Sequence, residues 1–182
     1  LFAGWAAFRA IANSAGISRE DLNDRQAPIF NSTARQEGKK LPPLILDLNA
    51  DGEIDYSNQS VAFDVDDDGE NEKVLSWAGP SDAFLAYDDN SNGVIDQGRE
   101  ISFTSYLKGA QTDLEGLAAF DTNGDGVLSA ADKTFGDFFI WQDRNQDGRS
   151  QVDELKTLKE LRIVAISLQS DGVERYPNDA TH

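Results

Sequence analysis

Five six-residue stretches of this chain repeat one pattern, with an acid at position 1, Asp or Asn at positions 3 and 5, and Gly at position 6. They begin at Asp47, Asp64, Asp88, Asp121 and Asp143 and are numbered loops one to five. Calcium prefers oxygen ligands, and a loop with oxygens at positions 1, 3 and 5 can wrap one ion. Gly at position 6 permits the sharp turn that brings a backbone carbonyl to the metal. The repeats therefore predict about five calcium sites as the only cofactors.

The predicted ligands follow from these positions, with position 7 contributing its backbone carbonyl. They are Asp47, Asn49, Asp51, Glu53 and Asp55 in loop one; Asp64, Asp66, Asp68, Glu70 and Glu72 in loop two; Asp88, Asn90, Asn92, Val94, Asp96 and Glu100 in loop three; Asp121, Asn123, Asp125, Val127 and Asp132 in loop four; and Asp143, Asn145, Asp147, Arg149 and Glu154 in loop five. The alternative for every loop is an acidic Asx-Gly turn that binds no metal.

The loops differ in the acid that closes them. Loop five has Glu154 at position 12, where a Glu can bind in a bidentate manner, and loop four has Asp132 there. Loop three carries Asp96 at position 9 and Glu100 at position 13, so its closure requires a slightly longer loop.

Loops one and two have no acid at position 12, where Asn58 and Leu75 stand. Three completions remain open for them. The ligand could be the acid at position 9, which is Asp55 or Glu72, or a water molecule, or a carboxylate from elsewhere in the chain.

The net charge of −17 and the pI of about 4.2 argue against nucleic acid or an anionic membrane as a partner, because both would repel the chain. Sixteen of the predicted ligands bind through a carboxylate, since Glu53 and Glu70 at position 7 contribute their backbone carbonyls. Five calcium ions would add ten positive charges and leave about −7. The calcium-free chain is therefore expected to be loosened by self-repulsion, and the calcium-bound chain to be compact.

The absence of certain residues excludes several chemistries. The chain has no cysteine, so it has neither disulfides nor thiolate sites, and calcium could stabilise a secreted form instead. His182 is the only histidine, which removes a Ser-His-Asp triad and a histidine zinc site. No stretch is apolar enough to span a membrane, so no membrane insertion is expected.

The predicted fold class is α+β, with small β-sheets and short helices organised around EF-hand-like calcium loops, and a separate N-terminal helical segment. Residues 1–15 place Leu1, Trp5, Phe8 and Ala12 at helical spacing, and residues 18–28 resemble a second short helix. Residues 31–40 read as a linker. The predicted division is therefore an N-terminal helical segment and linker at 1–40 and a calcium-binding domain at 41–182. Residues 1–40 could instead belong to a neighbouring domain that this one interrupts.

Within the calcium-binding domain, apolar runs predict strands at 43–46, 60–63, 101–107 and 162–168 and an extended segment at 73–77. Residues 81–87 are ambiguous. Helices are predicted at 112–120, with Thr112 as N-cap, and at 130–141 and 152–161. The tail after Ser170 is left unassigned.

Loops four and five begin only 22 residues apart, at Asp121 and Asp143, so two complete EF-hands do not fit between them. The chain also lacks Met, which lines the grooves of calmodulin-like proteins. A calmodulin-like pair is therefore excluded. A dockerin-like interaction module stays open as an alternative, although the spacing and the three additional loops disfavour it.

From Pro43 onward the chain resembles the self-processing module of RTX proteins of the FrpC type. The likeness lies in PLILDLNADG at 43–52, FDVDDDG at 63–69, NGVIDQG at 92–98 with Glu100, and WQDRNQDG at 141–148 running into DELKTL at 153–158. The resemblance implies a large calcium-binding protein exported by type I secretion, located outside the cell or at the bacterial surface. Its implied partners are neighbouring domains of the same protein and a host or surface ligand.

The resemblance also implies an activity, which is calcium-triggered cleavage of an Asp-Pro bond just before the module. In that reaction the Asp side chain attacks its own carbonyl, and a lysine can capture the anhydride. Pro42 stands at the matching position here, and the chain contains no Asp-Pro dipeptide. The leading hypothesis is therefore a calcium-stabilised module of an RTX adhesin or toxin-like protein that is not an enzyme. The alternative is a self-processing module whose scissile bond differs or lies outside this sequence.

Overall fold

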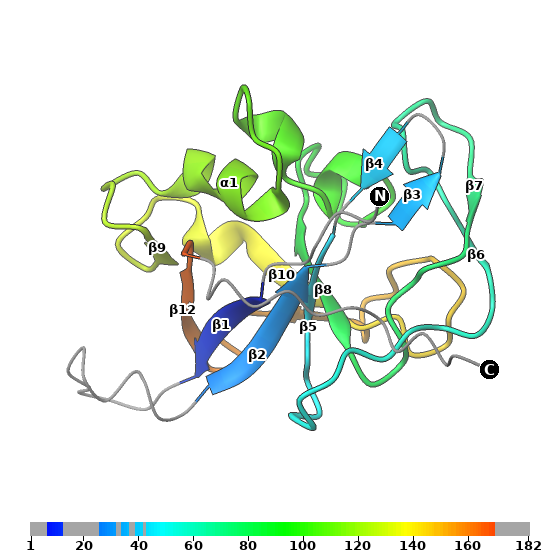
Figure 1. The fold of residues 1–182 in the computed structure, drawn as a ribbon, viewed down its shortest axis with the longest axis horizontal. Helices are drawn as coiled ribbons and strands as arrows, with labels where there is room; N and C mark the ends of the chain where they lie inside the picture. Colours follow the sequence, from blue (N-terminus) through cyan, green and yellow to red (C-terminus); the bar gives the residue numbers. More distant parts are fainter. Residues whose placement is uncertain (1–6, 13–25, 32–33, 37–38, 42, 170–182) are drawn as a thin grey trace.

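The computed structural model describes residues 7–12, 26–31, 34–36, 39–41 and 43–169, with side chains described for 43–169. The described strands form an eight-stranded sheet in the order β11-β10-β8-β5-β2-β1-β12-β9 (Figure 1). Neighbouring strands in this sheet pair antiparallel. The members are β1 (Ala7–Ala12), β2 (Gln26–Asn31), β5 (Leu44–Leu46), β8 (Ala83–Tyr87), β9 (Val127–Ser129), β10 (Phe138–Trp141), β11 (Leu155–Thr157) and β12 (Ile163–Ser167).

Two hairpins lie outside this sheet. One joins β3 (Ala34–Gln36) to β4 (Lys39–Leu41), and the other joins β6 (Val61–Phe63) to β7 (Glu72–Val74) around loop two. The described helices are short: the α-helix α1 (Asp113–Leu117) and 3-10 turns at Gly98–Glu100, Thr104–Tyr106, Ala118–Phe120 and Phe135–Asp137. The described part contains no helix of the length and apolarity needed to cross a bilayer.

Strands β5, β8 and β10 are buried on both faces, because alternate side chains of a strand point to opposite sides. Leu85 and Ile140 join a core with Phe103, Leu114 and Phe120, which we call the helix-side core. The side chains that alternate with these along β5, β8 and β10 point to the other face of the sheet. They belong to a second cluster, which we call the loop-side core. Its members are Ile45, Val61, Phe63, Trp77, Ala78, Phe84, Ala86, Ile95, Ile101 and Trp141.

The loop-side core is rich in aromatic rings that pack at tilted and edge-on angles. Trp77 lies 4.6 Å from Phe84, 5.1 Å from Phe63 and 5.4 Å from Trp141, measured between ring centroids. Tilted and edge-on pairs at such distances add about 0.5–1.5 kcal/mol each beyond their buried area. This cluster forms a rigid base beneath the loops that follow β5, β6, β8 and β10.

Several secondary-structure predictions are confirmed. The strands expected at 43–46, 60–63 and 162–168 correspond to β5, β6 and β12, and the ambiguous stretch at 81–87 contains β8. The helix at 112–120 begins with Thr112 as N-cap, where its side chain accepts a hydrogen bond from the backbone N–H of Glu115. The Glu115 carboxylate in turn accepts a hydrogen bond from the backbone N–H of Thr112, which completes a capping box.

The helices predicted at 130–141 and 152–161 are wrong. Phe138–Trp141 is strand β10, whose side chains alternate between the two cores, and Leu155–Thr157 is β11, which pairs with the edge of β10. The i, i+3 spacing of Leu155, Leu158 and Leu161 fits a helix in isolation. The backbone N–H and C=O groups of Leu155–Thr157 instead form their hydrogen bonds with the free edge of β10. Tertiary pairing therefore overrides local periodicity.

The strand predicted at 101–107 is also wrong, because this segment turns into a 3-10 helix at Thr104–Tyr106. The buried carboxylate of Asp113 accepts hydrogen bonds from Ser102 Oγ, Phe103 N and Thr104 N at 2.9, 2.8 and 3.1 Å. These bonds replace a strand ladder and force the turn.

The prediction of a helical N-terminal segment is wrong where the structure describes it. β1 and β2 pair with each other and lie between β5 and β12 in the large sheet (Figure 1). The expected linker at 31–40 contains the paired strands β3 and β4. For β1 and β2 the cause is tertiary, because β5 and β12 offer strand edges with which their backbones pair. The remaining predictions for residues 1–6 and 13–25 lie outside the described residues.

Candidate metal centre

All five loops share one backbone shape. Position 4 has a positive φ in each, at Ala50, Asp67, Ser91, Gly124 and Gln146, with values from 57° to 72°. Position 6 is a glycine with φ between 71° and 91° in every loop. Left-handed conformations are uncommon for non-glycine residues, so their recurrence at one position marks a common design. The repeated pattern thus corresponds to one repeated three-dimensional loop.

Side chains at positions 1, 3 and 5 brace this shape from inside. The Asp at position 1 accepts a hydrogen bond from the Gly at position 6 through Oδ2, at 2.8 or 2.9 Å, in all five loops. The position-5 side chain accepts from the position-7 N–H at 2.9 or 3.0 Å. In loops one, three, four and five, the Asn at position 3 accepts from the position-5 N–H. Carboxylate and amide oxygens therefore gather inside each turn.

The position-12 acids of loops four and five fold back across their loops. Asp132 accepts from Thr122 N at 2.7 Å through Oδ1 and from Ser129 N at 2.9 Å through Oδ2, which are positions 2 and 9. Glu154 accepts from Arg144 N, position 2 of loop five, at 3.0 Å through Oε1. Both acids are buried.

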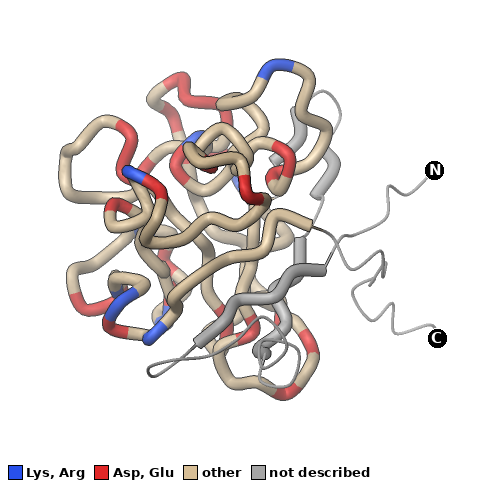
Figure 2. The backbone as a smooth tube through the Cα atoms, turned by 90° about the vertical axis from the view of Figure 1, so that its left-hand side faces the viewer, with Lys and Arg blue, Asp and Glu red and all other residues tan. Residues whose placement is uncertain are grey.

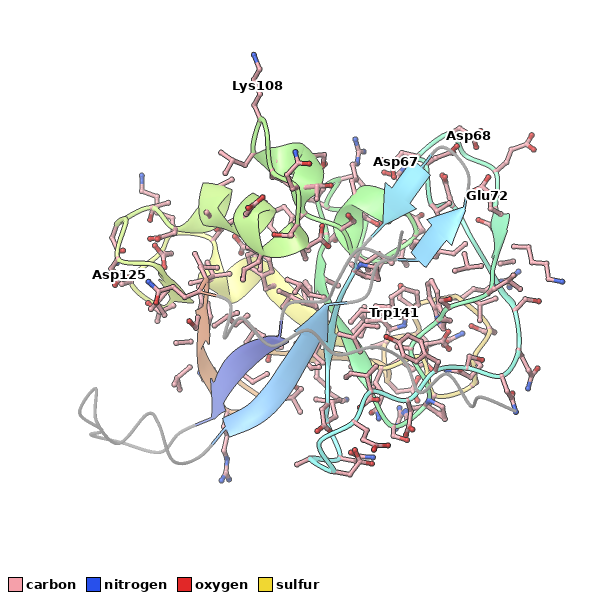
Figure 3. The ribbon with its side chains drawn as sticks, viewed as in Figure 1. Asp67, Asp68, Glu72, Lys108, Asp125 and Trp141 are labelled. Atoms are coloured by element: carbon pink, nitrogen blue, oxygen red, sulfur yellow. The ribbon has the colours of Figure 1, made fainter. Side chains whose placement is uncertain are left out.

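Loop three is closed by Glu100, which the sequence places one residue late. Its Oε2 accepts from Asp96 N at 2.8 Å and Gln97 N at 3.1 Å. In loop two, Glu72 at position 9 accepts from Val65 N at 3.0 Å. Carboxylate oxygens of Asp64, Asp66 and Glu72 lie within 4.8 Å of one another, a grouping that can hold a cation. Figure 3 shows Glu72 beside Asp67 and Asp68 on this loop.

Loop one is closed by Asp82, a residue far away in sequence that the pattern does not identify. Its Oδ2 accepts from Asp55 N at 2.6 Å, and its Oδ1 accepts from Leu48 N at 3.3 Å. These donors are positions 9 and 2 of loop one, the same two that Asp132 contacts in loop four. Asp55 itself is exposed and accepts a hydrogen bond from Ser81 Oγ at 3.0 Å. The one sequence signal for Asp82 is an acid directly before the fully apolar start of β8.

The closing acids fit a cation, because several of their oxygens are buried without a protein donor. Within the described part of the chain, Glu100 Oε1 and Glu154 Oε2 are buried and have no hydrogen-bond partner. Burial raises the pKa of Glu100 to about 7 and that of Asp82 to about 6. A buried carboxylate without compensation is costly, and a bound cation stabilises its charged form. Calcium would supply that charge.

The acidic residues lie mainly on the loops around the periphery, where few Lys and Arg interrupt them (Figure 2). Two ion pairs are described: Arg99 with Asp89 at 3.3 Å, and Arg144 with Asp153 at 3.1 Å. Neither uses a predicted ligand side chain. Asp and Glu at the ligand positions therefore keep their charge available for a metal.

Sequence comparison places this domain in the class of self-processing modules. The sequence matches the SPM domain family over residues 44–182, and the chain belongs to that family. It is 38% identical over 140 residues to the iron-regulated protein FrpA of Neisseria meningitidis serogroup C. The match covers 73% of this chain and 12% of FrpA, so the chain spans a small part of that relative's length. The resemblance to modules of FrpC-type RTX proteins is confirmed.

Proposed function

We propose that this chain is a calcium-stabilised module of a large RTX adhesin or toxin-like protein, and that it folds on calcium after secretion. The observation that carries this is the pair of buried, unpartnered oxygens on Glu100 and Glu154, found among the described residues at the closing positions of loops three and five. In each of the five loops, an acid folds back onto the backbone N–H of position 2, position 9 or both.

The net negative charge of the chain explains why folding would depend on calcium binding. With a net charge of −17 and acids concentrated in the loops, the metal-free chain repels itself. In the calcium-poor bacterial cytosol such a chain would stay loose enough for export. Outside, binding to the native loops would stabilise the native state in proportion to calcium concentration. The module would then hold neighbouring parts of its parent protein in place for a host or surface ligand.

We further propose that the module is not catalytic. Pro42 stands where the family's reactive Asp is expected, and proline carries no carboxylate to attack its own carbonyl. Family membership favours self-processing as the second candidate, because SPM domains are self-processing. Such cleavage would require a scissile bond that differs from Asp-Pro or lies outside this sequence, since residues 1–182 contain no Asp-Pro dipeptide.

The test follows folding and chain integrity together. Far-ultraviolet circular dichroism across a calcium titration should show structure forming, and magnesium should be a poorer substitute because it demands stricter geometry. Asp147→Asn keeps an oxygen at position 5 of loop five but removes the negative charge of a predicted ligand, and it should raise the calcium concentration at the folding midpoint by about tenfold or more. Asp137→Asn is the matched control, since Asp137 is exposed and lies outside the loops.

Denaturing electrophoresis of the same samples separates the two candidates. An intact chain at every calcium concentration supports the non-catalytic module. Calcium-dependent fragments, or adducts linked through lysine, would establish self-processing instead. Calcium-driven folding would be contradicted if calcium left the circular dichroism of the wild type unchanged. It would also be contradicted if Asp147→Asn and Asp137→Asn had equal folding midpoints.

A further inference from the structure

Loops two and three are joined by their backbones. Asp64, which opens loop two, forms a parallel β-bridge with Gln97 at the end of loop three. Arg99 N donates to Oδ1 of Asp67 at 3.1 Å, so the side chain at position 4 of loop two holds the backbone beside Glu100. Gly98 lies directly against the backbone of Val65. The closing turn of loop three therefore rests on loop two.

Loops three and five meet at equivalent positions. Ile95 N, position 8 of loop three, donates to Ser150 Oγ, position 8 of loop five, at 2.6 Å. Ile95 is itself buried in the loop-side core. A structural change in either loop therefore reaches the other through a single hydrogen bond and the core beneath it.

Loop five also contacts the strand that leads into loop two. A Cβ added at Gly148 would lie 2.5 Å from the carbonyl oxygen of Ala62 in β6 and against the side chain of Val61. A cavity of about 450 Å³ lies between the three loops, lined by residues such as Asn71, Asp96 and Arg149, one from each loop. Loop three therefore contacts both of the other loops, and loop five is linked to loop two through strand β6.

Loop four is placed differently. Its hydrogen bonds run within the loop and toward the segment of β12, as in Leu168 N to Gly126 O at 3.0 Å. Its apolar residue at position 8, Leu128, packs in the helix-side core. Figure 3 shows Asp125 of loop four at the opposite side of the molecule from Asp68 of loop two.

We propose that loops two, three and five bind calcium as one cooperative unit, while loop four binds independently. This rests on the proposed function. Calcium can bind only when a loop adopts its ligating shape, and loop three is held against loops two and five while loop five packs on the strand that leads into loop two. Ordering one loop therefore removes part of the ordering cost at the next, which raises its affinity. By linkage the effect is reciprocal, and such couplings are typically about 5–150-fold.

The first test compares equivalent residues in two loops. Asp68→Asn and Asp125→Asn both change position 5, in loop two and in loop four, and each keeps an oxygen for the position-7 N–H. The readout is tryptophan fluorescence during calcium titration in a Trp5→Phe background. Two tryptophans remain in this background and both report loop five, because Trp77 Nε1 donates to Asp143 Oδ2 at 2.7 Å and Trp141 lies two residues before Asp143. Both variants weaken one predicted site and so reduce the calcium-linked stability, but Asp68→Asn should shift the fluorescence midpoint about fivefold or more beyond the shift caused by Asp125→Asn, because only Asp68 belongs to the coupled loops.

The second test leaves every ligand in place. A Cβ at Gly98 would come 2.8 Å from the carbonyl carbon of Val65 and closer still to its oxygen, whereas a Cβ at Gly136 meets nothing within 4 Å. Neither glycine requires a positive φ. Gly98→Ala should separate loop three from loop two and reduce the Hill coefficient of calcium binding measured by calorimetry. Gly136→Ala should match the wild type.

The outcomes separate this proposal from the proposed function. If calcium produces no binding heat and no structural change in the wild type, both fail. If calcium binds and folds the chain but Asp68→Asn shifts the tryptophan midpoint no more than Asp125→Asn does, the coupling is refuted and the folding module stands. Equal midpoints and Hill coefficients for Gly98→Ala and Gly136→Ala would refute it in the same way.

Discussion

The indole nitrogen Nε1 of Trp77 donates a buried hydrogen bond of 2.7 Å to Oδ2 of Asp143, the first residue of loop five. The same oxygen accepts from Gly148 N at 2.9 Å. The aromatic base of the loop-side core is thereby tied to a predicted calcium ligand. Two residues 66 positions apart link core packing to the shape of a metal loop.

Trp77→Phe should preserve most of the ring packing and remove this donor. A hydrogen bond to a charged group contributes about 1.5–3 kcal/mol, so the free energy of unfolding in calcium should fall by about that amount beyond the packing loss. Urea denaturation at saturating calcium measures it. Trp141→Phe is the matched control, because in the described part of the chain the buried Nε1 of Trp141 has no partner. Equal losses for both variants would show that the Trp77 bond contributes nothing.

Asp82→Ala should remove the closing acid of loop one. The N–H groups of Leu48 and Asp55 lose their acceptor, at a cost of about 1–3 kcal/mol in the free energy of unfolding. Native mass spectrometry should also find one calcium ion fewer. Asp55→Ala is the comparison, since its exposed side chain bonds Ser81 and leaves Asp82 in place. If Asp55→Ala loses an ion and Asp82→Ala keeps it, the assignment of Asp82 is wrong.

Gly148→Ala and Gly52→Ala test whether the stability cost of replacing a loop glycine depends on the atoms packed around it. Both have a positive φ, 71° and 91°, so each alanine carries a left-handed strain of about 1–2 kcal/mol. Gly148→Ala also meets the β6 backbone, whereas a Cβ at Gly52 meets nothing within 4 Å. Thermal unfolding in calcium should therefore show a clearly larger loss for Gly148→Ala. Equal melting temperatures would mean that loop five does not pack on β6 as described.

Asp113 predicts a pH dependence that is separate from the metal loops. Burial raises its pKa to about 8, against the opposing effect of hydrogen bonds from Phe103, Ser102 and Thr104. Because the folded pKa lies above the unfolded one, the folded state binds the proton more tightly. The stability contributed by Asp113 is thus complete below about pH 4 and is lost as the pH rises to about 8.

Asp113→Asn keeps an acceptor oxygen and removes this titration. Relative to the variant, the wild type should gain stability as the pH is lowered from about 8 toward 4, by at most about 1.4 kcal/mol per unit. Taking the difference between the two proteins at each pH cancels the protonation of calcium ligands. Parallel unfolding free energies across this range would show that Asp113 does not titrate in it.

The sequence predicts those parts that depend on short-range chemistry. The five loops, the Thr112 cap and strands β5, β6 and β12 follow from residues a few positions apart. The failures at 130–141 and 152–161 arise because β10 and β11 are decided by each other and by β8, which periodicity within one segment cannot register. The segment Phe138–Trp141 is equally compatible with a helix when its sequence is considered alone. It forms a strand because its two faces pack into two different cores.

The closing acids show the same limit. Asp132 and Glu154 stand at position 12 and are identified by spacing, whereas Asp82 reaches loop one across 27 residues from its partner Asp55. Its contact depends on the turn between β7 and β8, where Gly79 N donates to Asp55 O at 2.7 Å. The alternative of a carboxylate from elsewhere in the chain anticipates such a residue without locating it.

Native mass spectra recorded with calcium and with a chelator test the central claim most directly. The account predicts about five bound ions, an intact chain, and a narrow charge-state envelope with calcium that broadens when the metal is removed. A chain that keeps the same narrow envelope in chelator, with no ions bound, would contradict it, because folding would then not depend on calcium.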